Sequence, residues 1–353
     1  ASNNAGTTPI HDSFLIDMTV LLTRERLAHA CCLEHEACRA LRAQNSKKIA
    51  ARPPGFRHVP ARRAESVYGA RVTIPKALTI AGVDPSGGAG ILADTKTFSA
   101  LGAYGCAVIA ALTAQNTRSV TGIHAVPPEF VRLQLDTLFA DVRIDAAKIG
   151  MLGTAPIARA VADGLAQPIA SGALPHLVVD PVMVAKSGDV LLTAEASAML
   201  IEAILPLATV ITPNLPEAGA LLSRTAPATL AEMRSAAQAL RKLMAADGER
   251  WVLVKGGHLS GEPVDVLHDG DRLLELPAPR IATRNTHGTG CTLSAAIAAL
   301  LPQHAAVPDA IAAAKRYLSS AIAHADALEV GSSEGHGPVH HFWQLWSSAA
   351  LDR

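Results

Sequence analysis

Residues 77–101 read ALTIAGVDPSGGAGILADTKTFSAL, and this stretch predicts the fold class of the chain. Its first five residues form a short apolar run that Gly82 closes, which is typical of a buried strand. Helical sequence follows over residues 88–101, with Ser86 as the candidate N-cap and Gly102 just beyond the end. A strand, a glycine-rich turn and a helix in this order predict a βα unit.

The same alternation continues along the chain. Further apolar runs that predict strands lie at residues 107–112, 146–149, 177–179, 209–211 and 251–254. Helical stretches fall between most of them, at residues 128–139, 156–166, 194–205 and 229–245. Residues 264–267 and 272–276 predict an edge hairpin, and predicted helices at 289–301 and 308–328 close the chain. We therefore expect an α/β fold in which helices cover both faces of a mostly parallel central sheet.

Composition excludes several classes of protein. The 353 residues carry 31 Lys and Arg against 31 Asp and Glu, so the chain lacks the basic excess of a general nucleic-acid binder. Hydrophobic residues make up 49% of the chain, which is enough for a core and excludes wholesale disorder. The sequence predicts no transmembrane span. Five cysteines and the absence of a signal-peptide pattern favour a reducing, cytoplasmic location.

The first 75 residues differ in charge from the rest. They carry 11 Lys and Arg against 6 Asp and Glu, whereas the remainder has an acidic excess. Residues 14–43 contain no proline and favour a helix, and the Arg- and Pro-rich residues 51–75 are typical of a linker. We divide the chain into an N-terminal extension at residues 1–75, partly helical or disordered, a main domain at 76–343 and a C-terminal tail at 344–353.

One cluster in this extension contains residue types that bind metals. Its members lie within ten residues and are His29, Cys31, Cys32, His35 and Cys38. Three of them, Cys31, His35 and Cys38, would share one face of a helix, and zinc can use three such ligands. The second, distant pair of ligands found in most zinc sites is missing. Buried thiols on a helix, or a segment without a fold of its own, are therefore favoured over a metal site.

The candidate functional residues follow the strand ends, where open parallel sheets bind their ligands. The first segment is residues 82–90, GVDPSGGAG. Gly88, Gly90 and Ala93 fit the loose dinucleotide-binding fingerprint, but residues 108–115 supply no carboxylate for a ribose. The lysine of a P-loop is also missing. The segment alone indicates either a close approach of the backbone to a ligand or a tight structural turn.

Two further strand exits carry side chains suited to a magnesium-bound polyphosphate. Asn214 and Glu217 open a predicted helix, and Asp180 ends another strand. Mg²⁺ keeps several waters and needs few protein oxygens, so these three side chains can form its surroundings. Lys186 lies in a polar loop and can reach a polyphosphate as a mobile cation. The alternative is an Asn214–Glu217 capping box and a solvated loop lysine.

The last segment, residues 285–292, reads NTHGTGCT and opens an Ala-rich predicted helix. Its small residues, Gly288, Thr289 and Gly290, let the first backbone N–H groups converge on one point. The helix dipole adds positive potential there, so the turn predicts an anion hole for a transferring phosphoryl group. We expect the same field to favour the thiolate of Cys291.

Together these segments resemble the ribokinase-like superfamily, in which an NxxE sequence and a Gly-Thr-Gly anion hole are hallmarks. More narrowly, the chain resembles the hydroxymethylpyrimidine/phosphomethylpyrimidine kinase family of thiamine biosynthesis. The resemblance runs from about Lys76 to Phe342 and excludes residues 1–75. It rests on the stretches ALTIAG, DPSGGAG, KTFSALGAYG, TAQNT, KIGML, AKSGD, ITPNLPEA, KGGH, NTHGTGCTLSAA and GPVHHF, in this order.

The resemblance implies a three-layer α/β/α kinase domain that uses ATP and Mg²⁺. It implies phosphorylation of 4-amino-5-hydroxymethyl-2-methylpyrimidine and then of its monophosphate, without a nucleic-acid or membrane partner, by a homodimer. Implied substrate contacts, by position, are Gly82, Asp94, Gln115, Met151 and Val178. Implied catalytic residues are Lys186, Gly288, Thr289, Gly290 and Cys291. Implied ATP contacts are Lys186, Thr212, Asn214, Glu217, Lys255 and Gly257, and implied metal contacts are Asp180, Asn214 and Glu217.

Cys291 narrows the resemblance, because many superfamily members carry an aspartate base at this position and the pyrimidine-kinase branch typically carries cysteine. The nearest alternative activity is that of a pyridoxal kinase. A subset of those enzymes uses a second cysteine in a lid, and the candidate lid at residues 182–190 has none. A non-catalytic sensor that binds the pyrimidine is a second alternative, and an NAD-dependent enzyme, which rests only on the glycine fingerprint, is a third.

Overall fold

The structure is a computed structural model that describes residues 73–183, 191 and 193–346. These residues belong to one compact unit, Val72–Arg353. The predicted helix at residues 14–43, the His and Cys cluster of the extension, and Lys186 lie outside the described residues. Within the described ranges no helix is both long and apolar enough to cross a bilayer.

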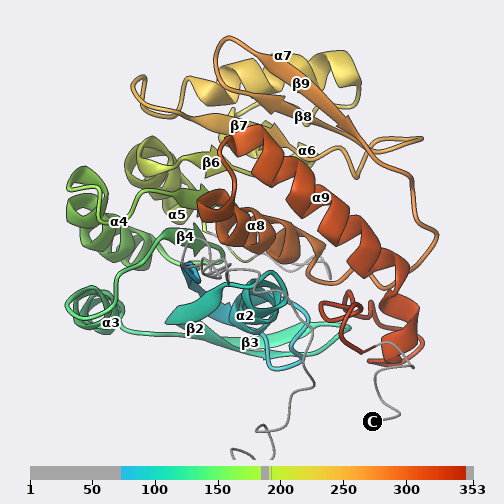
Figure 1. The fold of residues 1–353 in the computed structure, drawn as a ribbon, viewed down its shortest axis with the longest axis horizontal. Helices are drawn as coiled ribbons and strands as arrows, with labels where there is room; N and C mark the ends of the chain where they lie inside the picture. The colour runs from blue at the N-terminus through green and yellow to red at the C-terminus, as the bar shows by residue number, and fades with distance from the viewer. Residues whose placement is uncertain (1–72, 184–190, 192, 347–353) are drawn as a thin grey trace, which may run out of the picture. The chain divides into compact units, whose positions relative to one another are not determined.

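A single sheet runs through the described part of the chain (Figure 1). From one edge to the other its nine strands are β3 (Val120–Ala125), β2 (Tyr104–Gln115), β1 (Lys76–Val83), β4 (Ala146–Ile149), β5 (Leu177–Val179), β6 (Val210–Ile211), β7 (Trp251–Val254), β8 (Val264–His268) and β9 (Leu273–Pro277). The neighbouring strands β2, β1, β4, β5, β6 and β7 run parallel to one another. At the two edges of the sheet, β3 is antiparallel to β2, β8 to β7 and β9 to β8. The predicted mostly parallel sheet and its edge hairpin are confirmed.

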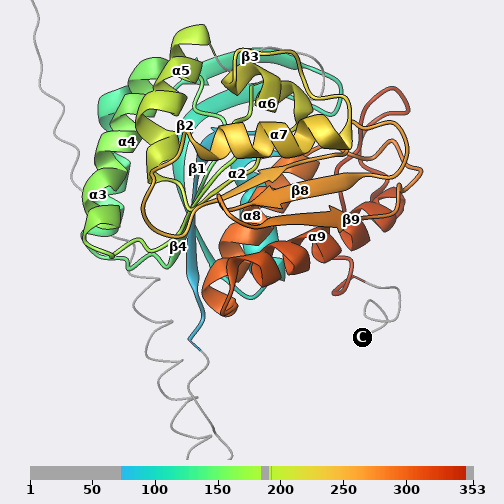
Figure 2. The same cartoon turned by 90° about the horizontal axis from the view of Figure 1, so that it is seen from above.

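Helices cover both faces of this sheet, as Figure 2 shows. One face carries α2 (Gly90–Ala100), α8 (Thr289–Leu300) and α9 (Val307–Ala323). The other carries α3 (Pro128–Phe139), α4 (Ala155–Ala170), α5 (Ala194–Met199), α6 (Leu215–Leu221) and α7 (Leu230–Arg241). Short turns of helix are η1 (Leu200–Ile204), η2 (Leu205–Leu207), η3 (Leu301–Gln303) and η4 (Ala325–Leu328).

Helix α8 is the most deeply buried of the described helices. Every residue from Thr292 to Leu300 is buried, since the helix lies between the sheet and the neighbouring helices α2 and α9. Its many alanines allow this close packing, and an apolar surface all round a helix is typical of such an internal position. The packing directs the first turn of α8, with Cys291, toward the carboxyl ends of the strands.

Strand β3 was not predicted. It pairs with β2, which spans Tyr104–Gln115 instead of the expected 107–112. The residues of β3 are mostly exposed, so they lack the apolar run that marks the other strands. Backbone pairing to the free edge of β2, rather than side-chain burial, accounts for this strand.

Several predicted helix ends also change. Helix α2 begins at Gly90 with Ala89 as its N-cap, so the expectation that Ser86 caps it is wrong. The Ser86 hydroxyl and amide instead donate to the Asp84 carboxylate, each at 2.9 Å. The helix expected over 194–205 changes to a π-helical turn at Leu200–Ile204, and α7 ends at Arg241, before the expected 245.

Phe98 tests the core between α2, α8 and the sheet. It is fully buried, and we expect Phe98→Ala to lower the free energy of unfolding by about 3–5 kcal/mol through lost burial and a residual cavity. Phe130, on α3, is 53% exposed and provides the matched control, with an expected change within about 0.5 kcal/mol. Urea unfolding of both variants measures the difference, and similar losses would contradict the placement of Phe98.

Candidate active site

The chemistry-bearing residues gather at the carboxyl ends of the parallel strands. Gly82 lies at the end of β1 and Met151 follows β4, while Asp180 follows β5. Thr212 follows β6, and Lys255 follows β7. The N-termini of α2 and α8 reach the same region, because the two helices pack against each other on one face of the sheet. Parallel strands therefore bring together segments that are far apart in sequence.

Two glycine turns touch each other here. Gly288 is the N-cap of α8 and has φ +75°, a left-handed conformation that favours glycine. A Cβ atom on Gly288 would lie 1.7 Å from the carbonyl oxygen of Gly88, and one on Gly88 would lie 2.3 Å from the His287 ring. Side chains at these two positions would separate the turns. The glycines of both predicted segments are thus needed for a backbone-to-backbone contact.

An acid–histidine pair joins the same turns. His287 Nε2 lies 2.7 Å from Asp84 Oδ2, and both side chains are buried. The amide of Ala89 also donates to that oxygen, at 3.0 Å. Burial acts to raise the pKa of Asp84, but hydrogen bonds from His287 and Ser86 hold this pKa below its usual value. Neither Asp84 nor His287 was predicted to have a role, although both lie within the quoted segments.

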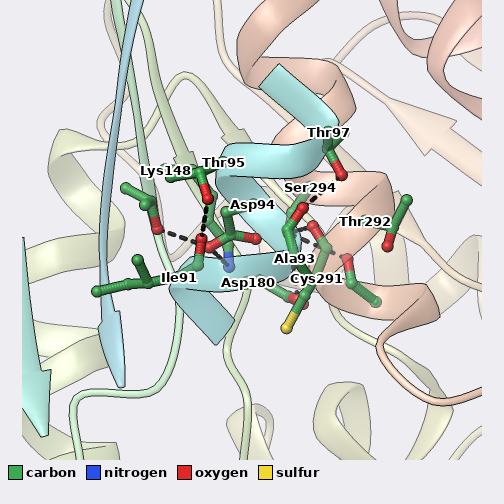
Figure 3. Close-up of polar contacts among 12 residues, drawn as sticks. Ile91, Ala93, Asp94, Thr95, Thr97, Lys148, Asp180, Cys291, Thr292 and Ser294 are labelled. Atoms are coloured by element: carbon green, nitrogen blue, oxygen red, sulfur yellow. Dashed lines mark hydrogen bonds and ion pairs between the residues drawn. The ribbon is translucent and has the colours of Figure 1, made fainter. Parts of the chain in front are cut away.

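Cys291 lies in the first turn of α8, and its sulfur points out from that turn (Figure 3). The backbone N–H of Gly90, at the start of α2, favours the ionised form of this sulfur and so acts to lower its pKa. The expected thiolate is nevertheless not supported. Burial raises the pKa of the Cys291 thiol to about 11, and the opposing effects of the Lys148 ammonium and the Gly90 amide are smaller. At neutral pH the group is a thiol.

A buried ion pair lies beside this turn. Lys148 Nζ is 2.8 Å from Asp94 Oδ2, and both side chains are fully buried (Figure 3). The Thr79 hydroxyl donates to the same oxygen at 2.6 Å, whereas Asp94 Oδ1 has no hydrogen-bond partner. Burial opposes the charge of Lys148, but the Asp94 carboxylate keeps the pKa of Lys148 above its usual value.

Lys148 was not singled out from the sequence. The available signal was a lysine inside the otherwise apolar strand AAKI, because lysine is almost never fully buried unless it is paired. Its pairing with Asp94 joins β4 to α2, and Thr79 adds β1. The carboxylate that the resemblance assigns to substrate binding is thus fixed by two neighbouring strands.

A second charged cluster occupies the ends of β5, β6 and β7. Lys255 Nζ lies 2.9 Å from Asp180 Oδ1 and 3.9 Å from Glu217 Oε2. The Thr212 hydroxyl donates to Asp180 Oδ1 at 3.2 Å. Burial opposes ionisation of Asp180, but Lys255 and Lys148 hold its pKa below the usual value, whereas burial raises the pKa of Glu217. A Cβ on Gly290 would lie 3.4 Å from both Lys255 Nζ and Asp180 Oδ2, so this cluster adjoins the first turn of α8.

Asn214 and Glu217 form the capping box of α6. Asn214 Oδ1 accepts from the Glu217 amide at 2.9 Å, and Glu217 Oε2 accepts from the Asn214 amide at 2.8 Å. The capping interpretation is therefore confirmed, and it occupies the Asn214 side-chain oxygen. Among residues 73–183 and 193–346 no three His, Cys, Asp or Glu side chains form a metal-ligand group. These donors fit a hydrated Mg²⁺ that takes one or two carboxylates and completes its shell with water and phosphate oxygens.

The remaining predicted site residues lie in different surroundings, and not all of them line the same region. A Cβ on Gly82 would lie 2.8 Å from the Met151 methyl carbon, so these two residues adjoin as expected. Gln115 Oε1 accepts from the Thr113 hydroxyl at 3.1 Å, and Gln115 lines a small hollow with His287. Val178 is fully buried in the core on the α8 side, so its placement does not support a role as a pocket wall. Gly257 is exposed just beyond Lys255.

Comparison with known proteins assigns the chain to one family. The model of the phosphomethylpyrimidine kinase family matches residues 84–340. A hydroxymethylpyrimidine/phosphomethylpyrimidine kinase from Rhizobium meliloti is 54% identical over 271 residues, which cover 76% of this chain and 98% of that protein. The protein of the same name from Escherichia coli shows the same identity and coverage. The chain belongs to the phosphomethylpyrimidine kinase family.

Solved structures agree with this family assignment. A phosphomethylpyrimidine kinase from Clostridium difficile is 38% identical, with a TM-score of 0.61, and the match covers 71% of this chain and all of that one. A pyridoxal kinase from Bacillus subtilis, solved with ADP, is 36% identical, with a TM-score of 0.69 and coverage of 78% and 100%. The kinase therefore has the ribokinase-like three-layer α/β/α fold that the resemblance implies.

Removal of Lys148 tests the buried pair. We expect Lys148→Met to destabilise the kinase by about 3–5 kcal/mol at pH 8, because it leaves Asp94 buried without a counter-charge. Burial raises the pKa of Asp94, so the variant is less destabilised at pH 5, where more of this carboxyl is protonated.

Combining Lys148→Met with Asp94→Leu removes both charges and supplies the control. It should recover most of the lost stability, because a well-packed apolar pair often replaces a buried ion pair without net cost. Urea unfolding at the two pH values measures these effects. Equal destabilisation of Lys148→Met at pH 5 and pH 8 would contradict the explanation.

Proposed function

We propose that this kinase transfers a phosphoryl group from ATP to 4-amino-5-hydroxymethyl-2-methylpyrimidine, and a second one to the resulting monophosphate, in thiamine biosynthesis. The observation that carries the proposal is the placement of Cys291 between the N-termini of α2 and α8, beside buried charges of both signs. Family membership supports the same chemistry, since relatives with 54% identity are named for these two kinase activities.

The pyrimidine site lies around the end of β1. Asp94 brings a carboxylate oxygen, Oδ1, that has no partner, and Gln115 brings an amide. Such groups match the donor and acceptor edge of an aminopyrimidine, and apolar atoms of Gly82 and Met151 can cover the faces of its ring. The proposed substrate contacts are Asp94, Gln115, Gly82 and Met151, whereas Val178 lies in the core on the α8 side of the sheet.

The nucleotide site lies over the ends of β5 to β7. Proposed ATP contacts are Lys186, Thr212, Asn214, Glu217, Lys255 and Gly257. Asp180 and Glu217 would hold a hydrated Mg²⁺, with Asn214 acting mainly through the helix start that it caps. When bound, the ion neutralises charge on the phosphate oxygens. Lys255 is already fixed by Asp180 next to Gly290, so it presents a cation beside the proposed anion hole at Gly288, Thr289 and Gly290.

Proton transfer distinguishes the two acceptors. The hydroxymethyl group loses a proton as its oxygen bonds to phosphorus, and the thiolate of Cys291 accepts that proton in our proposal. The monophosphate acceptor is already an anion and needs no base. Because burial raises the pKa of Cys291 to about 11, the reactive thiolate is a minor form at neutral pH.

An ATP-consumption assay tests the function itself. The full chain should turn over ATP with hydroxymethylpyrimidine and with its monophosphate, and more slowly with pyridoxal at equal concentration. A preference for pyridoxal would establish the alternative activity, which the fold of the Bacillus subtilis relative also accommodates. Absence of any ATP turnover would favour the non-catalytic sensor. The homodimer stays a prediction, which sedimentation of the full chain would check.

Replacement of Cys291 should separate the two transfers. We expect Cys291→Ala to slow the first transfer by about 10²–10⁴-fold, the usual contribution of a general base, and to slow the second transfer much less. Cys106→Ala is the matched control, because Cys106 is the other half-buried thiol of the described residues and lies on β2. Separate assays with each acceptor measure both rates, and equal losses would show that Cys291 is not a base.

The pH dependence gives a second measure of the same group. Below its pKa, the thiolate fraction of Cys291 increases with pH, so we expect the rate of the first transfer relative to the second to rise between pH 7.5 and 9.5. Cys291→Ala should abolish that rise. A ratio that stays constant with pH in the unmodified kinase would contradict a thiolate base.

A further inference from the structure

A segment near the C-terminus contacts the anion-hole turn although it lies about fifty residues beyond it in the sequence. We name Gly337–His341 the C-terminal strap; it is part of the GPVHHF stretch, which has no role in the function described so far. The strap follows η4 and passes beside the turn at residues 285–292. Its contacts with that turn are made by backbone and by side chain.

The first contacts are backbone contacts. The His287 amide donates to the Gly337 carbonyl at 3.0 Å, and the Gly337 amide donates to Asn285 Oδ1 at 3.1 Å. His287 also forms an isolated parallel bridge with Pro338. A Cβ atom on Gly337 would lie 2.2 Å from Asn285 Oδ1, so a side chain at this position would displace the Asn285 amide from the strap. The strap therefore contacts the residues that directly precede the proposed anion hole.

The side-chain contact comes from His341. Its Nε2 lies 3.1 Å from the hydroxyl oxygen of Thr292, and both residues are buried. Thr292 directly follows Cys291, and its amide donates to the Gly288 carbonyl at 2.8 Å. Burial lowers the pKa of His341 to about 3, so the ring is neutral at physiological pH. One side chain of the strap thus touches the helical turn that carries the reactive thiol.

The strap is itself held by α9. The Tyr317 hydroxyl donates to the His341 carbonyl at 2.8 Å, and the His340 amide donates to the Ala321 carbonyl at 3.0 Å. Tyr317 and Ala321 lie four residues apart on α9, so both face the strap. Helix α9 packs on α8. The strap therefore links α9 to the turn at the start of α8.

We propose that the C-terminal strap positions the anion-hole turn for phosphoryl transfer, and that His341 is a positioning residue that acts through Thr292. The catalytic part of this inference rests on the proposed kinase function. Phosphoryl transfer depends on placement of the reacting groups, and a shift of about 1 Å can cost roughly 100-fold in rate. Loss of the His341 contact frees the turn that holds Gly288 to Cys291, without removing any group that touches the substrate.

Two substitutions at His341 test the contact. His341→Leu removes the hydrogen bond, and we expect kcat of the first transfer to fall by about 10–100-fold while KM for the pyrimidine changes by less than about threefold. His341→Gln can place its amide near the position of Nε2. It should restore kcat to within about threefold of the unmodified kinase, since a suitable hydrogen-bonding group is again present.

A double-substitution cycle tests whether His341 acts through Thr292. Thr292→Val removes the hydroxyl and should reduce kcat as His341→Leu does, and the double variant should lose no more than either single one within about threefold. His268→Leu is the matched control, because His268 is also buried and makes one ring contact, 2.9 Å to the Arg272 carbonyl, in the β8–β9 hairpin. It should lower the melting temperature without lowering kcat.

Hydrogen exchange provides a readout that needs no substrate. Amides of residues 285–292 should exchange faster in His341→Leu than in the unmodified chain or in His268→Leu. If the unmodified chain shows no ATP turnover with either acceptor, the proposed function fails, and this exchange measurement decides on the strap alone. The strap proposal is overturned by unchanged exchange at 285–292, by kcat losses that multiply in the double variant, or by an equal kcat loss in His268→Leu.

Discussion

The site depends on the contact between two glycine turns, one before α2 and one before α8. Gly288 approaches the Gly88 carbonyl so closely that no side chain fits between them, and the Asp84–His287 pair holds the turns together. This contact brings the N-terminus of α2 to the sulfur at the start of α8, where the Gly90 amide reaches Cys291. Two helix N-termini thereby converge on one thiol, and their fields add at the point where we propose that the phosphoryl group is transferred.

Charge around that thiol is balanced in buried pairs. Lys148 neutralises Asp94 on one side, and Lys255 neutralises Asp180 and approaches Glu217 on the other. Such pairs contribute little net stability, but the loss of one partner is costly because the other remains charged in a poorly solvated place. The arrangement keeps cations at fixed positions near the turn without an excess of positive charge. It also explains why the thiol stays protonated, since the added positive field is smaller than the effect of burial.

The fold and the family could be predicted from residues that act locally. The apolar strand runs, the glycine turns and the capping pattern of Asn214 and Glu217 each depend on near neighbours in the chain, and the structure confirms them. Strand β3 was missed because pairing with β2, and not an apolar pattern, stabilises it. The ionisation of Cys291 was misjudged for a similar reason. A helix start favours the thiolate, but the extent of burial depends on segments that are distant in sequence.

The sequence by itself determined the α/β class, the order of the strand exits and the membership of the phosphomethylpyrimidine kinase family. The fold class follows from the periodicity of apolar residues, and the family follows from motifs that occur in a specific order and spacing. Only the tertiary structure decided which charges pair, that Lys148 is the partner of Asp94, and that Val178 belongs to the core. It also decided that His341 reaches Thr292 across 49 positions of sequence. The physical reason is that ion pairs, burial and hydrogen bonds between distant segments depend on how the layers pack, and no local pattern encodes that packing.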